Sequence, residues 1–272
     1  MSDKDFTAVC EFVHRAFGIA LSPAKKPLVR MRLRSVIHGR GLHSVREYLD
    51  RVLAQPDTEA LSELADAITT NHTFFWREAA HFELLRGRIL EEQRKLQERS
   101  PRPSMRIWCA AASTGQEPYT LAAAIRLGLG ADAKRWDLGV LGTDLSARAL
   151  EQARLGVYTA SEVEPLPSEW RRHMFEPAQG ELRVKDEVRA DVTLRRLNLL
   201  APFRFRQAFD VIFCRNVMIY FDEATRSQLA QRMVEVLRPG GYLIVGLSES
   251  LGASPPQLRH IAPAVYQRGD AS

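Results

Sequence analysis

The spacing of apolar residues divides the chain into two parts with different secondary structure. Up to about residue 98, apolar side chains recur every three to four positions, which is the period of an amphipathic helix. The segments with this spacing are Glu11–Phe17, Leu28–His38, Val45–Leu53, Glu59–Ile68 and Glu78–Gln97. The polar stretch "ERSPRPSM" follows, and its two prolines indicate a boundary. The pattern therefore predicts an all-α N-terminal domain over 1–98, a linker at 99–104 and a second domain over 105–272.

Beyond this linker, short apolar runs alternate with helical segments. The runs "MRIWCAA", "DLGVLGTD", "DVTLRRLN", "AFDVIFCRN" and "GYLIVGLS" are rich in Val, Ile, Leu and Phe, as buried strands are. Helical spacing separates several of them, at 116–127, 147–154 and 223–237. This alternation is typical of a parallel sheet covered by helices on both faces. Between about 165 and 195 it fails, and short polar strands around Pro177–Gly180 predict a small antiparallel insert.

Composition narrows the class of protein. The chain is 45% hydrophobic and 26% charged, which is ordinary for a soluble globular protein. No apolar run reaches the ~18–20 residues that a membrane-spanning helix needs, and the N-terminus lacks the apolar core of a signal peptide. The three cysteines form no C-x-x-C pair and the histidines no H-x-x-x-H pair. We therefore expect a cytoplasmic protein with reduced thiols and no metal.

The basic charge of the chain is concentrated in one segment. A net charge of +5 and a pI near 9.3 suit either a nucleic acid or an acidic protein partner. Between Ser22 and Arg46 there are seven Lys or Arg residues and no acidic residue. Arg30 and Arg34 are four positions apart, so they share one face of the helix expected at about 27–38. This face is either an ordinary solvated surface or a docking surface for an acidic partner.

The turn after the first predicted strand suggests a ligand. In open parallel sheets, ligands bind at the carboxyl ends of the strands. In "WCAAASTGQEPYT" a strand passes into a helix through a turn that holds one glycine, Gly115, and one carboxylate, Glu117. A pyrophosphate needs several glycines there, whereas S-adenosylmethionine has no phosphate and carries cationic groups. The turn therefore favours S-adenosylmethionine, although a first-turn acid also suits the helix dipole.

Polar residues follow three more of the predicted strands. Asp144 ends the second strand, where a carboxylate can accept hydrogen bonds from ribose hydroxyls. The structural alternative is that Asp144 or Ser146 caps the next helix. Asn198 ends "DVTLRRLN", where an amide can pair with an adenine edge. Arg215 and Asn216 follow "DVIFC" and place a charge and an amide over the cleft, with an ion pair as the alternative for Arg215.

Five motifs in chain order resemble the CheR family of chemotaxis receptor methyltransferases, from about Phe6 to Tyr266. They are "AITTNHTFFWRE", "RIWCAAASTGQEPYTLA", "LGTDLSARALEQARLGVY", "LRRLNLL" and "FDVIFCRNVMIYFDEATR". The resemblance implies a class I methyltransferase-type doubly wound α/β sheet with a small antiparallel β-subdomain, preceded by an all-α domain. It also implies S-adenosylmethionine-dependent methylation of glutamates on the cytoplasmic helices of chemoreceptors (methyl-accepting chemotaxis proteins). The products would be glutamate methyl esters and S-adenosylhomocysteine, formed in the cytoplasm at receptor arrays on the inner face of the membrane.

The resemblance also implies roles for individual residues. The segment 69–77 would contact the cofactor through Asn71, Thr73 and Arg77, and Arg77 would pair with its methionine carboxylate. The residues implied to complete the pocket are Gly115, Glu117, Asp144, Asn198, Leu199, Arg215 and Asn216, with Tyr220 on the acceptor side. Arg30 and Arg34 would then dock the Glu-rich receptor helices. The insert around Glu176–Glu181 is short beside family members that bind a receptor's C-terminal tail peptide, which argues against such tethering.

The expected reaction needs neither an acid nor a base. Its leaving group is a neutral thioether, and an acceptor glutamate with a pKa near ~4.3 is already ionised at neutral pH. We therefore expect no general base, and only positioning roles for Arg77 and Tyr220.

Two other functions compete with this interpretation. A nucleic-acid methyltransferase would suit the basic charge, but "RNVMIY" replaces an N-P-P-Y-type tetrad and Phe213 stands where a proline would precede a nucleophilic Cys214. A non-catalytic regulator that binds S-adenosylmethionine is the third class, although nothing in the predicted site looks broken.

Overall fold

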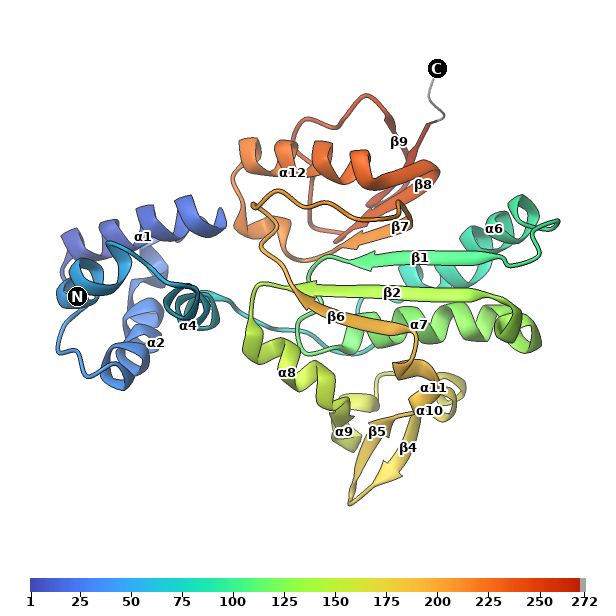
Figure 1. The fold of residues 1–272 in the computed structure, drawn as a ribbon, viewed down its shortest axis with the longest axis horizontal. Helices are drawn as coiled ribbons and strands as arrows, with labels where there is room; N and C mark the ends of the chain where they lie inside the picture. The colour runs from blue at the N-terminus through green and yellow to red at the C-terminus, as the bar shows by residue number, and fades with distance from the viewer. Residues whose placement is uncertain (270–272) are drawn as a thin grey trace.

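The N-terminal helices form a domain beside the sheet in the computed structural model, which describes residues 1–269 (Figure 1). This domain contains α1 (Asp3–Phe17), η1 (Pro23–Lys25), α2 (Lys26–Gly39), α3 (Val45–Tyr48), η2 (Leu49–Leu53) and α4 (Thr58–Ile68). The Ser2 hydroxyl caps α1, and Gly18 ends it at φ 70°. On α2 the buried residues are Val29, Leu33 and Ile37. Their spacing of four places the intervening basic residues on the solvent side.

The next helices belong to the sheet, contrary to the predicted domain of 1–98. They are α5 (Ala80–Leu84), η3 (Leu85–Ile89) and α6 (Leu90–Leu96). Phe82 and Ile89 share a hydrophobic cluster with α7 (Gln116–Leu129). Helical periodicity shows that a segment has an apolar face but does not say which partner covers it. The proline-rich stretch is therefore a loop inside the sheet domain, where the Gln97 amide bonds both the N–H and the C=O of Ser104.

Across the described residues, the main sheet has seven strands in the order β6-β2-β1-β7-β8-β10-β9. Their bounds are β1 (Ser104–Cys109), β2 (Asp137–Asp144), β6 (Val192–Arg196), β7 (Phe209–Cys214), β8 (Leu237–Val245), β9 (Leu258–Ala262) and β10 (Val265–Arg268). The strands from β6 to β8 in this order pair parallel, and β10 and β9 add an antiparallel edge. The last two strands were not predicted, because "LRHIA" and "VYQR" are short, and adjacent polar residues interrupt their apolar pattern.

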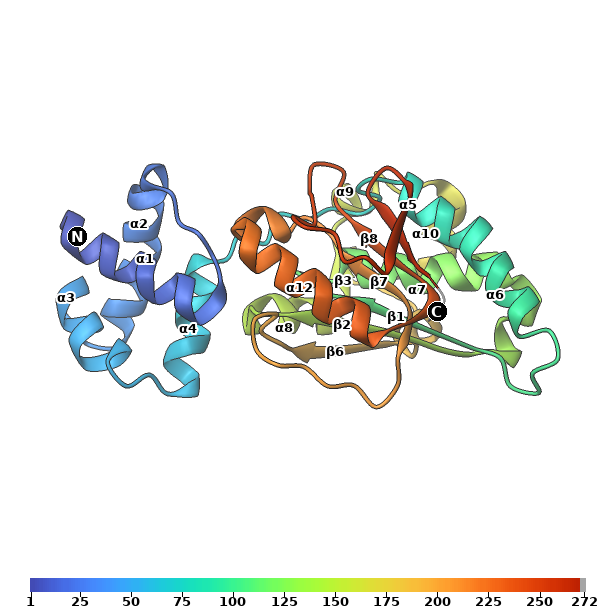
Figure 2. The same cartoon turned by 90° about the horizontal axis from the view of Figure 1, so that it is seen from above.

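Side chains of the central strands alternate between two cores. Ile107 and Cys109 lie in the cluster with α7 and α8 (Ala147–Leu155), whereas Trp108 and Ala110 lie in the cluster with α12 (Glu223–Val236). Both faces of the sheet are thus covered by helices (Figure 2). This burial on both faces explains why the sequences of these strands are continuous apolar runs. The predicted doubly wound α/β sheet behind an all-α domain is confirmed. In the described chain, 1–269, no helix is both long and apolar enough to cross a membrane.

A second, antiparallel sheet contains β3 (Val157–Tyr158), β5 (Glu181–Val184) and β4 (Phe175–Ala178), in that order. Around it lie α9 (Ala160–Val163), α10 (Ser168–Met174) and α11 (Asp186–Arg189). The predicted insert exists, but its limits of about 165 to 195 are wrong. It begins earlier, at β3, because a two-residue strand leaves no periodicity to detect. It ends before β6, which is an edge strand of the main sheet.

Candidate functional site

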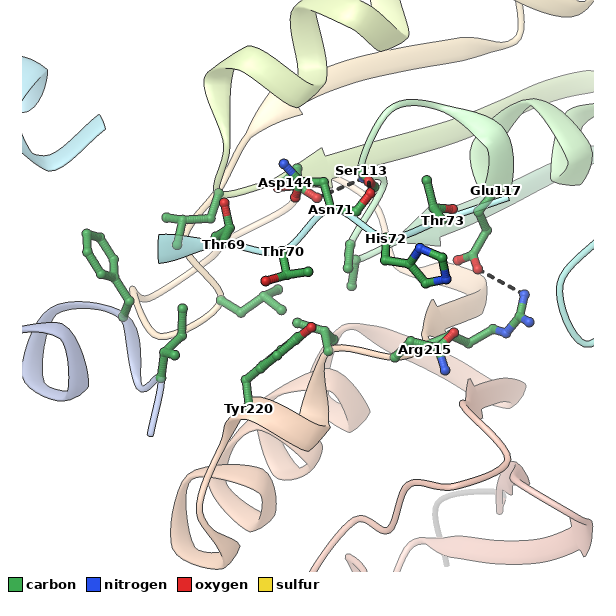
Figure 3. A pocket seen from close by; sticks show the side chains of 18 of the residues that line it. Thr69, Thr70, Asn71, His72, Thr73, Ser113, Glu117, Asp144, Arg215 and Tyr220 are labelled. Carbon is green, nitrogen blue, oxygen red and sulfur yellow. Dashed lines mark hydrogen bonds and ion pairs between the residues drawn. The ribbon is translucent and has the colours of Figure 1, made fainter. Parts of the chain in front are cut away.

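A cavity lies at the carboxyl ends of the central strands and is bordered on one side by the helical domain (Figure 3). Phe17, Ile19 and Lys25 line it from the helical domain, and the segment from Ile68 to Arg77 crosses it. The predicted residues that line this cavity are Asn71, Thr73, Arg77, Glu117, Asp144, Asn198, Leu199, Arg215, Asn216 and Tyr220. Parallel pairing explains this convergence, because it brings the strand ends to one edge of the sheet.

Gly115 is not among the residues that line the cavity, although Ser113 and Glu117 on either side of it are, so its approach to a ligand stays a prediction. Its φ is 101°, a conformation that favours glycine. A Cβ at this position would lie 2.5 Å from the Tyr158 hydroxyl and 3.0 Å from the Ala153 Cβ. That hydroxyl donates to the Thr114 carbonyl at 2.7 Å. The glycine is therefore required by the turn and by packing against the protein itself.

Glu117 lies in the first turn of α7 with its carboxylate between the core and the cavity. Arg215 Nη1 donates to Oε2 at 2.9 Å (Figure 3). Cys109 Sγ donates to Oε1 at 3.2 Å. Burial raises the pKa of Glu117, and the Arg215 guanidinium opposes that rise. Since carboxylate oxygens accept more than one hydrogen bond, Glu117 can still receive an ammonium group from the cavity.

Arg215 forms the ion pair that the sequence left as its alternative role. Its side chain is buried and also lies 3.3 Å from Glu78 Oε2. Its Nη2 donates to the Arg77 carbonyl, and its guanidinium stacks 5.2 Å from the centre of the Phe82 ring. With these partners, Arg215 holds the two carboxylates in place, and its side chain also lines the cavity.

Two further carboxylates hold the loops after β7 and β8, and neither was predicted. Glu78 accepts from Asn216 Nδ2 at 3.2 Å and from the Leu247 N–H at 3.2 Å. Glu249 accepts from the backbone N–H of Asn216 at 2.6 Å and of Ile219 at 3.2 Å. Asn216 thus bridges both carboxylates. The sequence signal for Glu78 is its place directly after Arg77 in "TTNHTFFWRE". No sequence signal marks Glu249.

Asp144 ends β2 with both oxygens already in use by backbone groups. Oδ2 accepts from the Ser113 N–H at 2.8 Å and Oδ1 from the Ser146 N–H at 2.9 Å. Burial raises the pKa of Asp144, while these amides lower it. The helix cap is Ser146, whose Oγ accepts from the Ala149 N–H at 3.0 Å. Each carboxylate oxygen of Asp144 therefore retains a lone pair for a hydroxyl group.

The crossing segment offers a cationic group to the cavity. Arg77 Nη1 donates to the His72 carbonyl at 3.1 Å, and its guanidinium lies 5.7 Å from the centre of the Phe74 ring. Within residues 1–269, Arg77 makes no ion pair with a carboxylate. The Ser113 hydroxyl donates to the Asn71 carbonyl at 3.3 Å and so anchors the segment that crosses the cavity. The charge of Arg77 is thus available for an anionic group of a ligand.

The Asn198 amide lines the cavity but is also engaged within the protein, so its role toward adenine stays a prediction. Its Nδ2 donates to the Ala16 carbonyl of α1 at 2.8 Å, and its Oδ1 accepts from the Leu200 N–H at 3.0 Å. The side chain therefore ties the helical domain to the loop after β6. Tyr220 contacts the same domain, because its carbonyl accepts from the Ala20 N–H at 2.8 Å and Lys25 Nζ lies 5.1 Å from its ring centre.

This arrangement fits S-adenosylmethionine. The cavity combines an acidic group for an ammonium, a second acid at a strand end for ribose hydroxyls, and an unpaired guanidinium for a carboxylate. Those are the polar groups of the adenosine and methionine parts of that molecule. In the described part of the chain, no group of His, Cys, Asp or Glu is arranged to hold a metal ion.

Comparison with known proteins identifies the family. The model of the CheR methyltransferase all-alpha domain matches residues 4–69, and that of the CheR methyltransferase SAM binding domain matches residues 71–266. A chemotaxis protein methyltransferase of Borreliella burgdorferi is 35% identical over 98% of this chain and 95% of its own. Chemotaxis protein methyltransferase 2 of Pseudomonas aeruginosa is 37% identical over 97% of this chain and 92% of its own.

The N-methyltransferase NodS of Bradyrhizobium japonicum, solved with S-adenosyl-l-homocysteine, is a more distant likeness. It is 14% identical over 60% of each chain, with a TM-score of 0.32, which is too low to bear on function. The two family models, in contrast, meet at the point where the helical domain gives way to the segment that crosses the cavity. This chain belongs to the CheR family of S-adenosylmethionine-dependent methyltransferases.

Proposed function

We propose that this chain methylates glutamate side chains on the cytoplasmic helices of chemoreceptors. The observation that carries the proposal is the cavity itself, in which Glu117, Asp144 and Arg77 complement S-adenosylmethionine. The names of the relatives, chemotaxis protein methyltransferases, support a chemoreceptor as the partner. The enzyme would act in the cytoplasm at receptor arrays.

The bound cofactor supplies a methyl group on a positively charged sulfur. Asp144 would hold the ribose, Glu117 the ammonium group and Arg77 the methionine carboxylate. Arg215 opposes the rise in the pKa of Glu117 that burial causes and fixes its carboxylate, so that the ammonium would meet a group already in position. Asn71 and Thr73 on the crossing segment would close the cavity over the ligand. The protein thereby aligns the methyl group and excludes water.

We predict that kcat stays nearly constant between about pH 6.5 and 8.5, because an acceptor carboxyl with a pKa near ~4.3 needs no base. The measurement is initial rate at saturating substrates across this range. A steep loss of kcat on one side, abolished by replacing one titratable side chain, would instead identify a proton-transferring residue.

The exposed basic face of α2 suits an acidic partner. Arg30 and Arg34 are exposed there, next to the exposed apolar side chains of Leu28 and Met31. The double variant Arg30→Glu/Arg34→Glu is expected to lower kcat/KM for a receptor fragment by about tenfold at low salt. The deficit should shrink at high salt, because exposed charges are screened.

The matched control is Lys134→Glu/Arg135→Glu. It makes the same change of charge on exposed residues before β2, at the opposite end of the sheet from the cavity. Equal kcat/KM values for the two double variants at low salt would exclude the α2 face as a docking surface.

The acceptor class is tested by incubating the protein with S-adenosylmethionine labelled in its methyl group. Separate reactions contain a chemoreceptor cytoplasmic fragment, RNA and DNA. We expect label on the receptor fragment alone, released as methanol by mild alkali because carboxyl methyl esters hydrolyse easily. Alkali-stable label on nucleic acid would establish the competing function, and cofactor binding without transfer would indicate a regulator.

A further inference from the structure

Three exposed apolar side chains lie on segments that border the cavity. Phe74 is 45% exposed, Ile219 52% and Leu247 57%, and they are among the large apolar residues left in solvent over the described chain. Phe74 lines the cavity directly. Ile219 precedes Tyr220, which lines it, and Leu247 follows β8 at the same edge of the sheet.

Hydrogen bonds to two carboxylates, Glu249 and Glu78, join these segments. The Ile219 N–H donates to Glu249 Oε1 at 3.2 Å, and the Gly246 N–H donates to Oε2 at 2.7 Å. The Glu249 carboxylate thus brings Ile219 close to Gly246, the residue before Leu247. The Leu247 N–H donates to Glu78 Oε2 at 3.2 Å, four residues after Phe74. The segments that carry the three apolar side chains are therefore linked beside the cavity, although they come from three distant parts of the sequence.

Neighbouring residues lack the room to relax this arrangement. A Cβ on Gly246 would lie 2.6 Å from Glu249 Oε2 and 2.7 Å from Asn216 Nδ2. Asn216 itself has φ 58°, in the left-handed region that asparagine tolerates better than most residues. Close packing around Gly246 thus supports the segments that carry the exposed Ile219 and Leu247. Apolar groups fixed around a site in this way commonly mark a contact for a macromolecular partner.

We propose that Phe74, Ile219 and Leu247 form an apolar rim that receives the acceptor helix. This inference rests on the proposed function and names the contact that this function requires. An acceptor glutamate must enter the cavity from its helix, so the helix backbone and the residues beside the glutamate must press against the surrounding loops. An apolar rim fits small apolar side chains there, and it would displace water from the carboxylate that attacks.

The charges near the rim agree with this occupant. Lys25 lines the same cavity, and its ammonium group would attract the carboxylate of the acceptor. On α2, exposed Leu28 and Met31 alternate with Arg30 and Arg34, so the second contact surface of the protein also combines apolar and basic groups. The partner that fits both surfaces is an amphipathic helix with acidic residues and small apolar residues side by side.

The test compares Ile219→Ser and Leu247→Ser with Leu155→Ser and Leu96→Ser in the full chain. The control leucines are 66% and 76% exposed and lie on α8 and α6, outside the cavity walls. The probe is a purified chemoreceptor cytoplasmic fragment. We expect each rim variant to raise KM for the fragment by about tenfold, as loss of a buried apolar contact does, with the dissociation constant for S-adenosylmethionine unchanged. The controls should match the wild type in both quantities.

Three outcomes would overturn the inference. Rim variants with the KM of the controls would show that the rim is not a contact, while wild-type methylation of the fragment would leave the proposed function intact. A weaker affinity for S-adenosylmethionine in the rim variants would mean that these residues support the cofactor instead. Failure of the wild type itself to methylate the fragment would remove the proposed function and the rim together.

Discussion

Replacement of Arg215 by alanine should lower the free energy of unfolding by about 3–5 kcal/mol, because it leaves two carboxylates inside the protein without their cation. Arg215 Nη1 lies 2.9 Å from Glu117 and Nη2 lies 3.3 Å from Glu78, and its side chain is fully buried. Its other contacts include the Phe82 ring and the Arg77 carbonyl, neither of which carries a charge. Denaturant unfolding followed by circular dichroism measures the loss.

The pH dependence of this loss has a definite sign. Burial alone would raise the pKa of Glu78, but Arg215 and hydrogen bonds from Asn216 and Leu247 bring it below its ordinary value. In the wild type, Glu78 therefore adds stability above the ordinary carboxyl pKa, and this contribution is lost as the pH falls. Without Arg215 the carboxylate protonates more easily, so the difference between variant and wild type should narrow under mildly acidic conditions.

Arg183→Ala is the control for removing an arginine from an ion pair. Arg183 Nη2 lies 2.8 Å from Glu176, but both side chains are exposed, and such pairs add little. Its unfolding curve should stay close to that of the wild type. If Arg215→Ala unfolds at the same denaturant concentration as Arg183→Ala, the ion pairs of Arg215 do not stabilise the fold.

Replacement of Asp144 by asparagine should weaken S-adenosylmethionine binding by about 30- to 100-fold, roughly 2–3 kcal/mol, because hydrogen bonds to a charged acceptor are lost. The carboxylate accepts from Ser113 and Ser146 and retains lone pairs toward the cavity. An amide has one acceptor atom in place of two, and its NH₂ group would face a backbone N–H. Titration calorimetry with S-adenosylmethionine measures the change.

Asp210→Asn separates this effect from general damage to the sheet. Asp210 is buried at the start of β7, at the end of the sheet away from the cavity, and it accepts from the Arg106 N–H at 2.7 Å and from Arg238 at 2.6 Å. We expect this variant to lose stability and to bind S-adenosylmethionine as the wild type does. Equal affinities for Asp144→Asn and Asp210→Asn would remove Asp144 from the ligand site.

The strands and the side chains at their ends could be predicted because the relevant physics is local. A fully buried parallel strand is a continuous apolar run, and the residue after it lies at the binding edge whatever the strand order. This reasoning brought Glu117, Asp144 and Asn216 to one cavity before the order of strands was known. Partner choice between elements is not local. The helices from Ala80 to Leu96 were therefore assigned to the wrong domain, although their helical period was correct.

The hydrogen-bond partners of the site residues could not be predicted from the sequence either. Asn198 has the residue type and the place of an adenine contact, yet its amide joins α1 to the sheet domain. Gly115 looked like a residue for ligand approach, whereas Tyr158 of the insert occupies the space beside it. Glu249 lies in a loop with no periodic pattern, and its role appears only when the ends of β7 and β8 lie side by side.

The most direct measurement is a crystal structure of the full chain with S-adenosylhomocysteine. We predict that its ribose hydroxyls lie within hydrogen-bond distance of Asp144, its ammonium group beside Glu117 and its carboxylate against Arg77. The sulfur should then point toward Tyr220 and the rim of Phe74, Ile219 and Leu247. A product molecule bound outside this cavity, or inside it without contacts to Asp144 and Glu117, would contradict the proposed site.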